Sequence, residues 1–263
     1  MAIRDRFDLV ILDWAGTMVD FGCLAPVVAL RKAFALQGVN ISDAQARRDM
    51  GKSKVDHVRA LLRDPEVAAA WVLTRGVAAG EAEVAALMTD LEPLMREQAA
   101  RAARLIDGAR TTIETLRAEG LRVASSTGYT REMMAPVLRE AAAQGYSPDH
   151  LVCSGETPAG RPTPLMIYKA CAELGVWPLS RVVKVDDAEA GVTEGRAAGC
   201  FTVGVAASGN GVGLSPQALQ ALSAPDRAER IAAAGKSLLA AGADVVIDSV
   251  AQLVPVLREP RVG

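Results

Sequence analysis

The stretch that decides the fold is DLVILDWAGTMVD, residues 8–20. Its first part, 8–12, is a short and mostly aliphatic run that ends at Asp13, which predicts a buried strand. Similar runs follow at 121–126, 151–153 (the weakest), 182–185, 201–205 and 244–247. Helical patterns stand between and after them at 109–119, 130–143, 163–174, 188–198 and 249–258. Strands that alternate with helices predict an α/β protein whose parallel sheet is covered on both faces.

Residues 21–102 interrupt this alternation. The segment is rich in Ala, Leu, Arg and Glu, and no part of it has a convincing strand pattern. Helices are expected near 24–37, 42–49, 53–63, 65–74 and 81–102. We therefore expect a doubly wound, Rossmann-like core of residues 1–20 and 103–263, with an all-helical cap domain, 21–102, inserted after the first strand.

Two other segments lie outside this pattern. The glycine-rich loop 207–215, ASGNGVGLS, is expected to be mobile or to face a ligand, and the C-terminal REPRVG, 258–263, is expected to fray.

Composition limits the class of protein. Half of the 263 residues are hydrophobic and 23% are charged, which supports a substantial core. The formal net charge of −2 gives no general attraction to nucleic acid or anionic membranes. The four cysteines form no C-x-x-C pair and no zinc-type cluster. With no signal-peptide or membrane-span pattern, these features favour a soluble cytoplasmic protein.

Polar residues follow several of the expected strands. Asp13 ends the first, Ser126-Thr127-Gly128-Tyr129 end the second, and Asp186-Asp187 end the strand near 182. A later loop adds Arg161. In open α/β sheets, ligands bind at the carboxyl ends of the strands, so we expect these residues to form one site.

This set of residues suits phosphoryl chemistry. The carboxylate of Asp13 can attack phosphorus and form an acyl phosphate. Asp13 and Asp187 can share a Mg²⁺ ion with a backbone carbonyl, and Asp186 would support it. Thr127 can donate to a phosphoryl oxygen, and Arg161 can neutralise developing charge. Simpler interpretations are a strand-end turn for Asp13, a helix cap for Thr127 and a surface ion pair for Arg161.

The segment DWAGTMVD resembles the motif that follows the first strand in the haloacid dehalogenase superfamily. That resemblance implies a second aspartate two positions after the nucleophile, as the acid for an alcohol leaving group. This chain has Ala15 there. The chain is then inactive, or its leaving group needs no acid.

Lys54, within MGKSKVDHV (50–58), supports the second option. An amine can condense with an aldehyde to give an iminium, which accepts electrons from a neighbouring C–P bond. Carbon then leaves as a neutral enamine, and no acid is needed beside Asp13. His57 lies three residues further along the same helix face and can shuttle protons. The simpler interpretation is that Lys54, like Lys52, is a solvated helix lysine.

Five segments together resemble the phosphonoacetaldehyde hydrolase (phosphonatase) family: DWAGTMVDFGC, MGKSKVDHVRALL, SSTGYTREMM, GRPTPLMIYK and KVDDAEAGVTEG. The resemblance covers nearly the whole chain. It implies hydrolysis of phosphonoacetaldehyde to acetaldehyde and phosphate in 2-aminoethylphosphonate degradation, with Mg²⁺ and a homodimer.

The resemblance also assigns roles by position. Asp13 matches the nucleophile, Lys54 the Schiff-base lysine, and the Ala15 carbonyl and Asp187 the metal ligands. Further active-site positions correspond to Cys23 near the cap hinge, Met50, His57, Gly128 and Tyr129.

One departure from the family and two other functions stay open. Many relatives have a further aspartate four residues after the one matching Asp187, and here that position is Gly191. Either Asp186 or Glu189 can replace it.

The other functions are a phosphomonoesterase or sugar-phosphate mutase of the same superfamily, which the absence of an acid at Ala15 disfavours, and a non-catalytic scaffold or phospho-ligand sensor.

Overall fold

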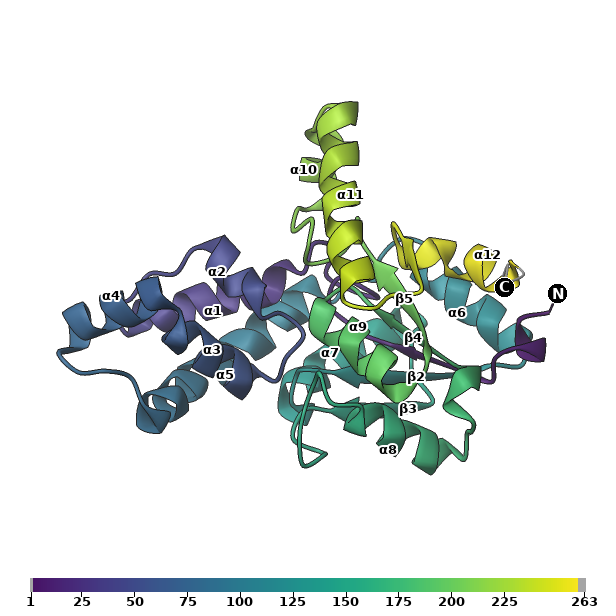
Figure 1. Cartoon of the computed structure of the whole chain (residues 1–263), viewed down its shortest axis with the longest axis horizontal. Coiled ribbons are helices and arrows are strands. Elements are labelled where there is room, and N and C mark those ends of the chain that lie inside the picture. The colour runs from purple at the N-terminus through teal and green to yellow at the C-terminus, as the bar shows by residue number, and fades with distance from the viewer. Residues whose placement is uncertain (1, 260–263) are drawn as a thin grey trace.

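The computed structural model of the chain describes residues 2–259 and contains a six-stranded parallel sheet (Figure 1). The spatial order is β3-β2-β1-β4-β5-β6. The strands are β1 (Leu9–Leu12), β2 (Arg122–Thr127), β3 (His150–Cys153), β4 (Val182–Asp186), β5 (Phe201–Val205) and β6 (Val245–Ile247). The expected α/β class with a doubly wound parallel sheet is confirmed. The fraying expected at the C-terminus falls largely on residues 260–263, outside the described range.

Helices cover both faces of the sheet because the apolar side chains of each strand point alternately to the two sides. Leu9 and Ile11 pack with α8 and α9, whereas Val10 and Leu12 belong to the core shared with α6, α7 and α12. These helices are α6 (Ala109–Ala118), α7 (Arg131–Ala143), α8 (Leu165–Leu174), α9 (Glu189–Ala198) and α12 (Leu253–Arg258). Short 3-10 helices occur at Ile3–Asp5, Leu179–Arg181 and Val250–Gln252.

The strand order changes direction beside β1. From β1 the chain adds β2 and then β3 on one side, and β4, β5 and β6 extend the sheet on the other. The crevice at such a switch point is where open α/β sheets bind ligands. Asp13 follows β1 directly, and β4 ends at Asp186 with Asp187 next to it, so all three carboxylates come from the two strands that flank this point.

Six helices separate β1 from β2 in the sequence, and the first five of them lie to one side of the sheet in Figure 1. These five are α1 (Leu24–Leu36), α2 (Asp43–Arg48), α3 (Lys54–Arg63), α4 (Pro65–Arg75) and α5 (Glu81–Ala102). The break between α3 and α4 follows from local chemistry. The Asp64 side chain accepts hydrogen bonds from the first turn of α4, and Pro65 occupies the first helical position.

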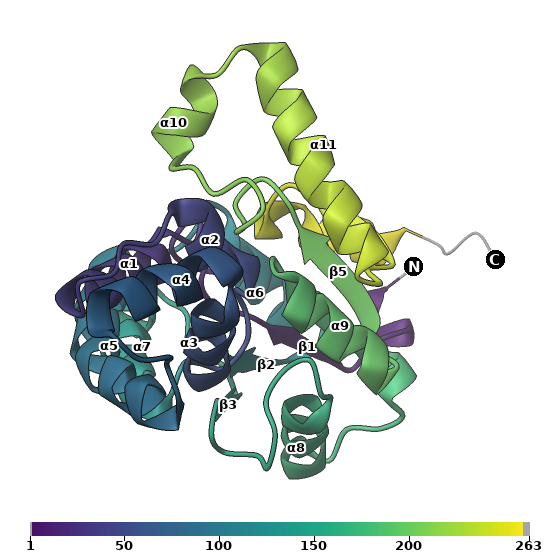
Figure 2. The same ribbon diagram turned by 60° about the vertical axis from the view of Figure 1, so that its left-hand side comes forward.

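A helical pair near the C-terminus was not expected from the sequence. Helices α10 (Pro216–Ala221) and α11 (Ala224–Ala240) project from the sheet in both views (Figures 1 and 2). Each begins after a serine N-cap, Ser215 and Ser223, that is followed within two residues by proline. Among the described residues, no helix combines the length and apolarity that crossing a bilayer requires.

Candidate active site

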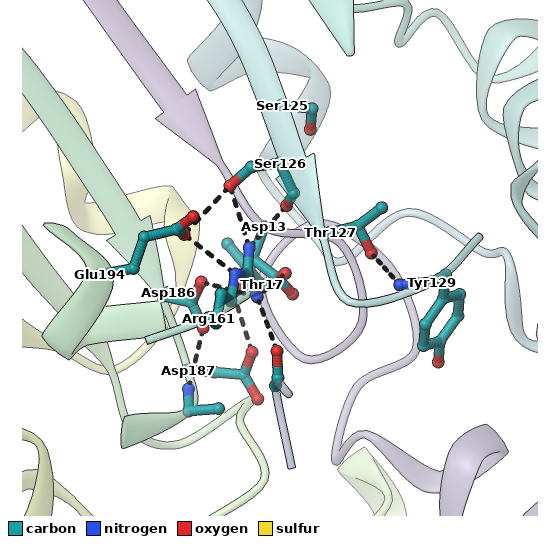
Figure 3. Close-up of polar contacts among 12 residues, drawn as sticks. Asp13, Thr17, Ser125, Ser126, Thr127, Tyr129, Arg161, Asp186, Asp187 and Glu194 are labelled. Carbon is teal, nitrogen blue, oxygen red and sulfur yellow. Dashed lines mark hydrogen bonds and ion pairs between the residues drawn. The ribbon is translucent and has the colours of Figure 1, made fainter. Parts of the chain in front are cut away.

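Nearly all the residues expected in the site meet around one small cavity. It is lined by Asp13, Ala15, Cys23, Met50, Gly51, Lys52, Lys54, Thr127, Gly128, Tyr129, Arg161, Asp187 and Ala188. Figure 3 shows Asp13, Thr127, Tyr129, Arg161 and Asp187 of this set. The volume of about 20 Å³ leaves room for about one water molecule, so the inserted helices are closed over the sheet. A larger cavity of about 550 Å³ lies elsewhere, beside Asp20 and α10.

Arg161 ties the nucleophile position to the sheet. Its side chain is completely buried, so the interpretation as a surface ion pair is wrong. Nη1 donates to Asp13 Oδ1 at 2.8 Å, and Nε donates to Glu194 Oε2 at 2.9 Å. Nη2 donates to the Ser126 carbonyl at 2.7 Å and to its hydroxyl at 3.0 Å (Figure 3). This set of hydrogen bonds fixes the guanidinium of Arg161, which in turn orients Asp13 before any substrate arrives.

Sequence reasoning missed a second buried cation, Lys184. Its Nζ lies 2.9 Å from Asp186 Oδ2 and 3.3 Å from Glu194 Oε2, and it donates to Ser126 Oγ at 2.8 Å. The sequence did contain a signal for this buried ion pair, because a lysine inside the apolar run VVKV requires an acidic partner. Glu194 was missed because it lies on a helix with a mixed polar pattern, where a buried acid looks like a solvated one.

Asp187 differs from the other acids of the site. Thr17 Oγ1 donates to its Oδ1 at 3.1 Å and the Asn210 N–H to its Oδ2 at 2.8 Å. Within residues 2–259 it takes part in no ion pair with a lysine or arginine side chain. Burial first, and then Asp13, raise the pKa of Asp187 well above its ordinary value. Because no cation pairs with Asp187, its ionised form is disfavoured unless a positive charge binds beside it.

The surroundings of Asp187 suit a hard cation. Single carboxylate oxygens of Asp13, Asp186 and Asp187 lie within 4.8 Å of one another. Gly16 has a φ of 84°, and a Cβ there would lie 2.2 Å from Asp187 Oδ2. The glycine thus lets the carboxylate approach the peptide group that follows Ala15. An all-oxygen donor set of this kind can hold a divalent metal ion such as Mg²⁺.

Asp13 shares this electrostatic environment. Its pKa is raised to about 6, first by burial and then by the neighbouring Asp186, while Arg161 acts in the opposite direction. A cation next to it would favour the ionised form that a nucleophile requires.

Lys54 lies on the other wall of the cavity, at the start of α3. It is 2% exposed, so the interpretation as a solvated helix lysine is wrong. Its Nζ is 3.9 Å from Met50 Sδ and 5.3 Å from the centre of the Tyr129 ring. Burial lowers the pKa of Lys54 from 10.5 to about 8. Lys52 shows the contrast, because its side chain is 35% exposed and pairs with Asp49.

Close backbone contact joins the inserted helices to the sheet. A Cβ at Gly128 would lie 2.4 Å from the Lys52 carbonyl oxygen, so only glycine lets the two loops meet. Arg47 of α2 spans the same boundary. Its Nη1 donates to Gly22 O at 3.0 Å and to Asn210 Oδ1 at 3.1 Å, and its Nη2 donates to Gly213 O at 3.1 Å.

Arg47 and Asn210 place the glycine-rich loop at the site. Asn210 contacts Arg47 through its side chain and Asp187 through its N–H. Residues 206–210 are buried, so the loop faces the site and packs tightly there.

Thr127 and His57, two further residues expected in the site, differ in their position relative to the cavity. Thr127 lines the cavity and its Oγ1 accepts the Tyr129 N–H, while Thr130 provides the side-chain N-cap of α7 in its place. His57 is completely buried and is not among the lining residues, and burial, followed by Lys54, lowers its pKa well below the ordinary value. Its role in proton transfer stays a prediction.

Comparison with known proteins identifies the family. The haloacid dehalogenase-like hydrolase family matches residues 7–199. The chain belongs to the haloacid dehalogenase-like hydrolases. Within this family it groups with the phosphonoacetaldehyde hydrolases. Those of Paraburkholderia phytofirmans and Bacillus cytotoxicus are 47% and 39% identical to it, over 95% and 96% of this chain and 94% and 96% of theirs.

Solved structures share the fold of this chain. A crystal structure of a phosphonoacetaldehyde hydrolase-like protein from Oleispira antarctica superposes with a TM-score of 0.93 at 40% identity, covering 96% of this chain and 91% of the other. A β-phosphoglucomutase-like protein from Bacteroides vulgatus superposes with a TM-score of 0.65 at 19% identity, over 97% and 91%, and shares the fold alone.

Proposed function

We propose that this hydrolase cleaves the carbon–phosphorus bond of phosphonoacetaldehyde to acetaldehyde and phosphate, through an imine on Lys54 and an aspartyl phosphate on Asp13. One observation carries the proposal: a fully buried lysine and a buried aspartate line the same closed cavity, and alanine occupies position 15. The relatives in Paraburkholderia and Bacillus, which are named as phosphonoacetaldehyde hydrolases, support this substrate.

Mg²⁺ fits the acidic side of the cavity, because Asp187 has no counter-charge and the available donors are all oxygens. Asp13, Asp187 and the Ala15 carbonyl would hold it. When bound, the ion would screen the repulsion between the Asp13 carboxylate and the phosphonate oxygens.

Lys54 acts first. Its neutral amine attacks the aldehyde carbon, water leaves, and a protonated imine forms next to the carbon that carries phosphorus. Burial favours the neutral amine at the start. Tyr129 and Met50 pack around the Nζ atom and keep bulk water away from the imine.

Asp13 acts second. A carboxylate oxygen attacks phosphorus, the C–P bond breaks, and its electron pair forms the C=C bond of a neutral enamine on Lys54. Arg161 holds Asp13 in place, and Thr127 donates to a phosphoryl oxygen. The enamine then takes up a proton on carbon, for which His57 is the candidate shuttle.

Two hydrolytic steps close the cycle. One water molecule attacks the aspartyl phosphate and releases phosphate, which regenerates Asp13. A second water molecule hydrolyses the imine and releases acetaldehyde, which regenerates Lys54. The inserted helices must open for substrate entry and product release, because the closed cavity holds about one water molecule.

The domain organisation, pathway, cellular location and oligomeric state belong to the same proposal. Residues 21–102 act as a cap domain on a core of 1–20 and 103–263, and Cys23 and Gly128 lie where cap and core meet. The enzyme serves 2-aminoethylphosphonate degradation in the cytoplasm as a homodimer. Exposed Leu36 of α1 and Leu73 of α4 support a partner surface on the cap.

Borohydride trapping tests the proposal. With phosphonoacetaldehyde and Mg²⁺, reduction should attach a two-carbon adduct to Lys54, found by peptide mass mapping, and untreated samples should release phosphate. Lys54→Arg should abolish the adduct, and Lys52→Arg, the matched control, should retain it. Release of phosphate from ordinary monoesters with no adduct would assign the protein to the general phosphatases.

A further inference from the structure

We propose that the cavity of about 550 Å³ beside α10 binds a small organic anion with an apolar body, and that this ligand favours the closed arrangement of the inserted helices. None of the residues that line this cavity also lines the active-site cavity. The inference therefore concerns a second site and goes beyond the proposed function.

The walls of the cavity beside α10 come from three parts of the chain. Two of them, within residues 20–24 and 102–107, are the connections through which the chain passes between the sheet and the inserted helices. The third is the pair α10 and α11, and Ser249 near the end of β6 completes the lining. Figures 1 and 2 show α10 on the side of this pair that faces the inserted helices. A ligand in the cavity would therefore contact both connections at once.

The two connections are also bonded to each other. The Asp20 N–H donates to the Ala102 carbonyl at 3.1 Å, and the Ile106 N–H donates to the Met18 carbonyl at 2.9 Å. The inserted helices can move relative to the sheet only about these connections. A ligand that fits the cavity in its present shape therefore stabilises the closed arrangement relative to an open one.

The size and the walls of the cavity suit a small organic molecule. Ligand sites commonly measure about 300–1,000 Å³ and are mostly apolar. Ile106 and Leu219 are buried in the walls, and Phe21, Leu24 and Leu105 are half-buried there. An apolar body that covers the three half-buried side chains removes apolar surface from water, which favours binding.

The charges in the walls favour an anion. Arg227 is half-buried and Arg104 is exposed, and within residues 2–259 neither side chain forms an ion pair or a hydrogen bond. The carboxylate of Asp20 is already occupied, because its two oxygens accept the first two N–H groups of α1 at 3.0 and 2.9 Å. Asp107, the other acid in the lining, is exposed, so water and salt screen its charge. A carboxylate or sulfonate group can therefore pair with the two arginines.

The dye 8-anilinonaphthalene-1-sulfonate tests the site, because its aromatic body carries one sulfonate and its fluorescence increases in apolar surroundings. We expect one dye molecule per chain, with the near-ultraviolet circular dichroism of the native protein unchanged. Arg227→Gln and Arg104→Gln should each weaken binding about tenfold, through loss of a charge-assisted hydrogen bond. Arg230→Gln is the matched control, since Arg230 is exposed on α11 outside the lining, and it should bind the dye like the parent chain.

Hydrogen exchange reports the effect on the inserted helices. Residues 50–53 lie outside the cavity beside α10, and the Lys52 carbonyl meets Gly128 where the inserted helices contact the sheet. Exchange in 50–53 should become slower when the dye binds to the parent chain. At the same subsaturating dye concentration, the change should be much smaller in Arg227→Gln.

Inorganic phosphate distinguishes the two cavities. It should not displace the dye, because it cannot cover the apolar walls beside α10, whereas a dye bound in the active site would compete with it. The inference is overturned if the parent chain binds no dye, if Arg227→Gln and Arg230→Gln bind it equally, if phosphate displaces it, or if exchange in 50–53 does not change. Borohydride trapping at Lys54 tests the proposed function without these residues, so the two failures can be told apart.

Discussion

At the scale of single residues, the amine of Lys54 should give the reaction its pH dependence. Its pKa of about 8 lies below the ordinary 10.5 because of burial. The neutral amine attacks the aldehyde, and its fraction increases with pH up to this pKa. We expect the rate of adduct trapping to rise about tenfold per pH unit below pH 8 and to level off above it. A profile that keeps rising towards pH 10.5 would mean that Lys54 is solvated when it reacts.

Arg161 should contribute to stability as well as to activity. It is completely buried and faces Asp13, Asp186 and Glu194, so Arg161→Met leaves buried acids with one cation fewer. We expect a loss of about 3–5 kcal/mol in the free energy of unfolding, measured by urea denaturation without metal.

Arg31→Met is the control for this prediction. The Arg31–Asp43 pair is more than half exposed, and its loss should change the free energy of unfolding by less than about 1 kcal/mol. Equal losses in the two variants would show that the buried network around Arg161 adds no stability.

The sequence revealed the site residues that end strands and missed two buried residues that support them, Lys184 and Glu194. Asp13 and Asp187 stand at strand ends, where the fold class alone predicts ligand contacts. The partners of Arg161 come from β2, β4 and α9, and such a meeting depends on register and packing that no local pattern encodes.

At the scale of elements, Arg47 links α2 to the loop 207–215 and, through Asn210, to Asp187. We expect Arg47→Ala to loosen the closed arrangement, because four carbonyl or amide acceptors lose their donor. Hydrogen exchange should become faster in α2 and in residues 207–215, and KM should rise.

Arg48→Ala is the neighbouring control, since Arg48 pairs with Asp64 within the inserted helices and does not reach the sheet. Faster exchange in both variants, or in neither, would contradict a specific link through Arg47.

The strands and most helices could be predicted within one or two residues, because they carry strong apolar patterns and clear caps. Helices α10 and α11 could not. Only Leu219 of α10 is buried, and α11 buries only Ala234, Gly235 and Leu238, so neither helix presents a large apolar face to the core. The serine caps followed by proline were the available signal.

At the scale of the whole molecule, we expect a homodimer with its contact on the inserted helices. Leu73 is 90% exposed and Leu36 67% exposed, and burying such side chains against a second copy is favourable. Sedimentation should give twice the 27.5 kDa chain mass. Leu73→Lys should shift the protein towards monomer, whereas Trp177→Lys, at a position preceding β4 that is 82% exposed, should not. A monomeric parent chain would contradict the prediction.

The closed cavity of about 20 Å³ should also limit the pace of the enzyme. Neither an aldehyde phosphonate nor phosphate fits in a cavity of that size, so we expect every catalytic cycle to include at least one movement of the five inserted helices away from the sheet and back. Because such a movement displaces solvent, we expect friction with the surrounding liquid to set an upper limit on turnover, however fast the bond cleavage itself becomes.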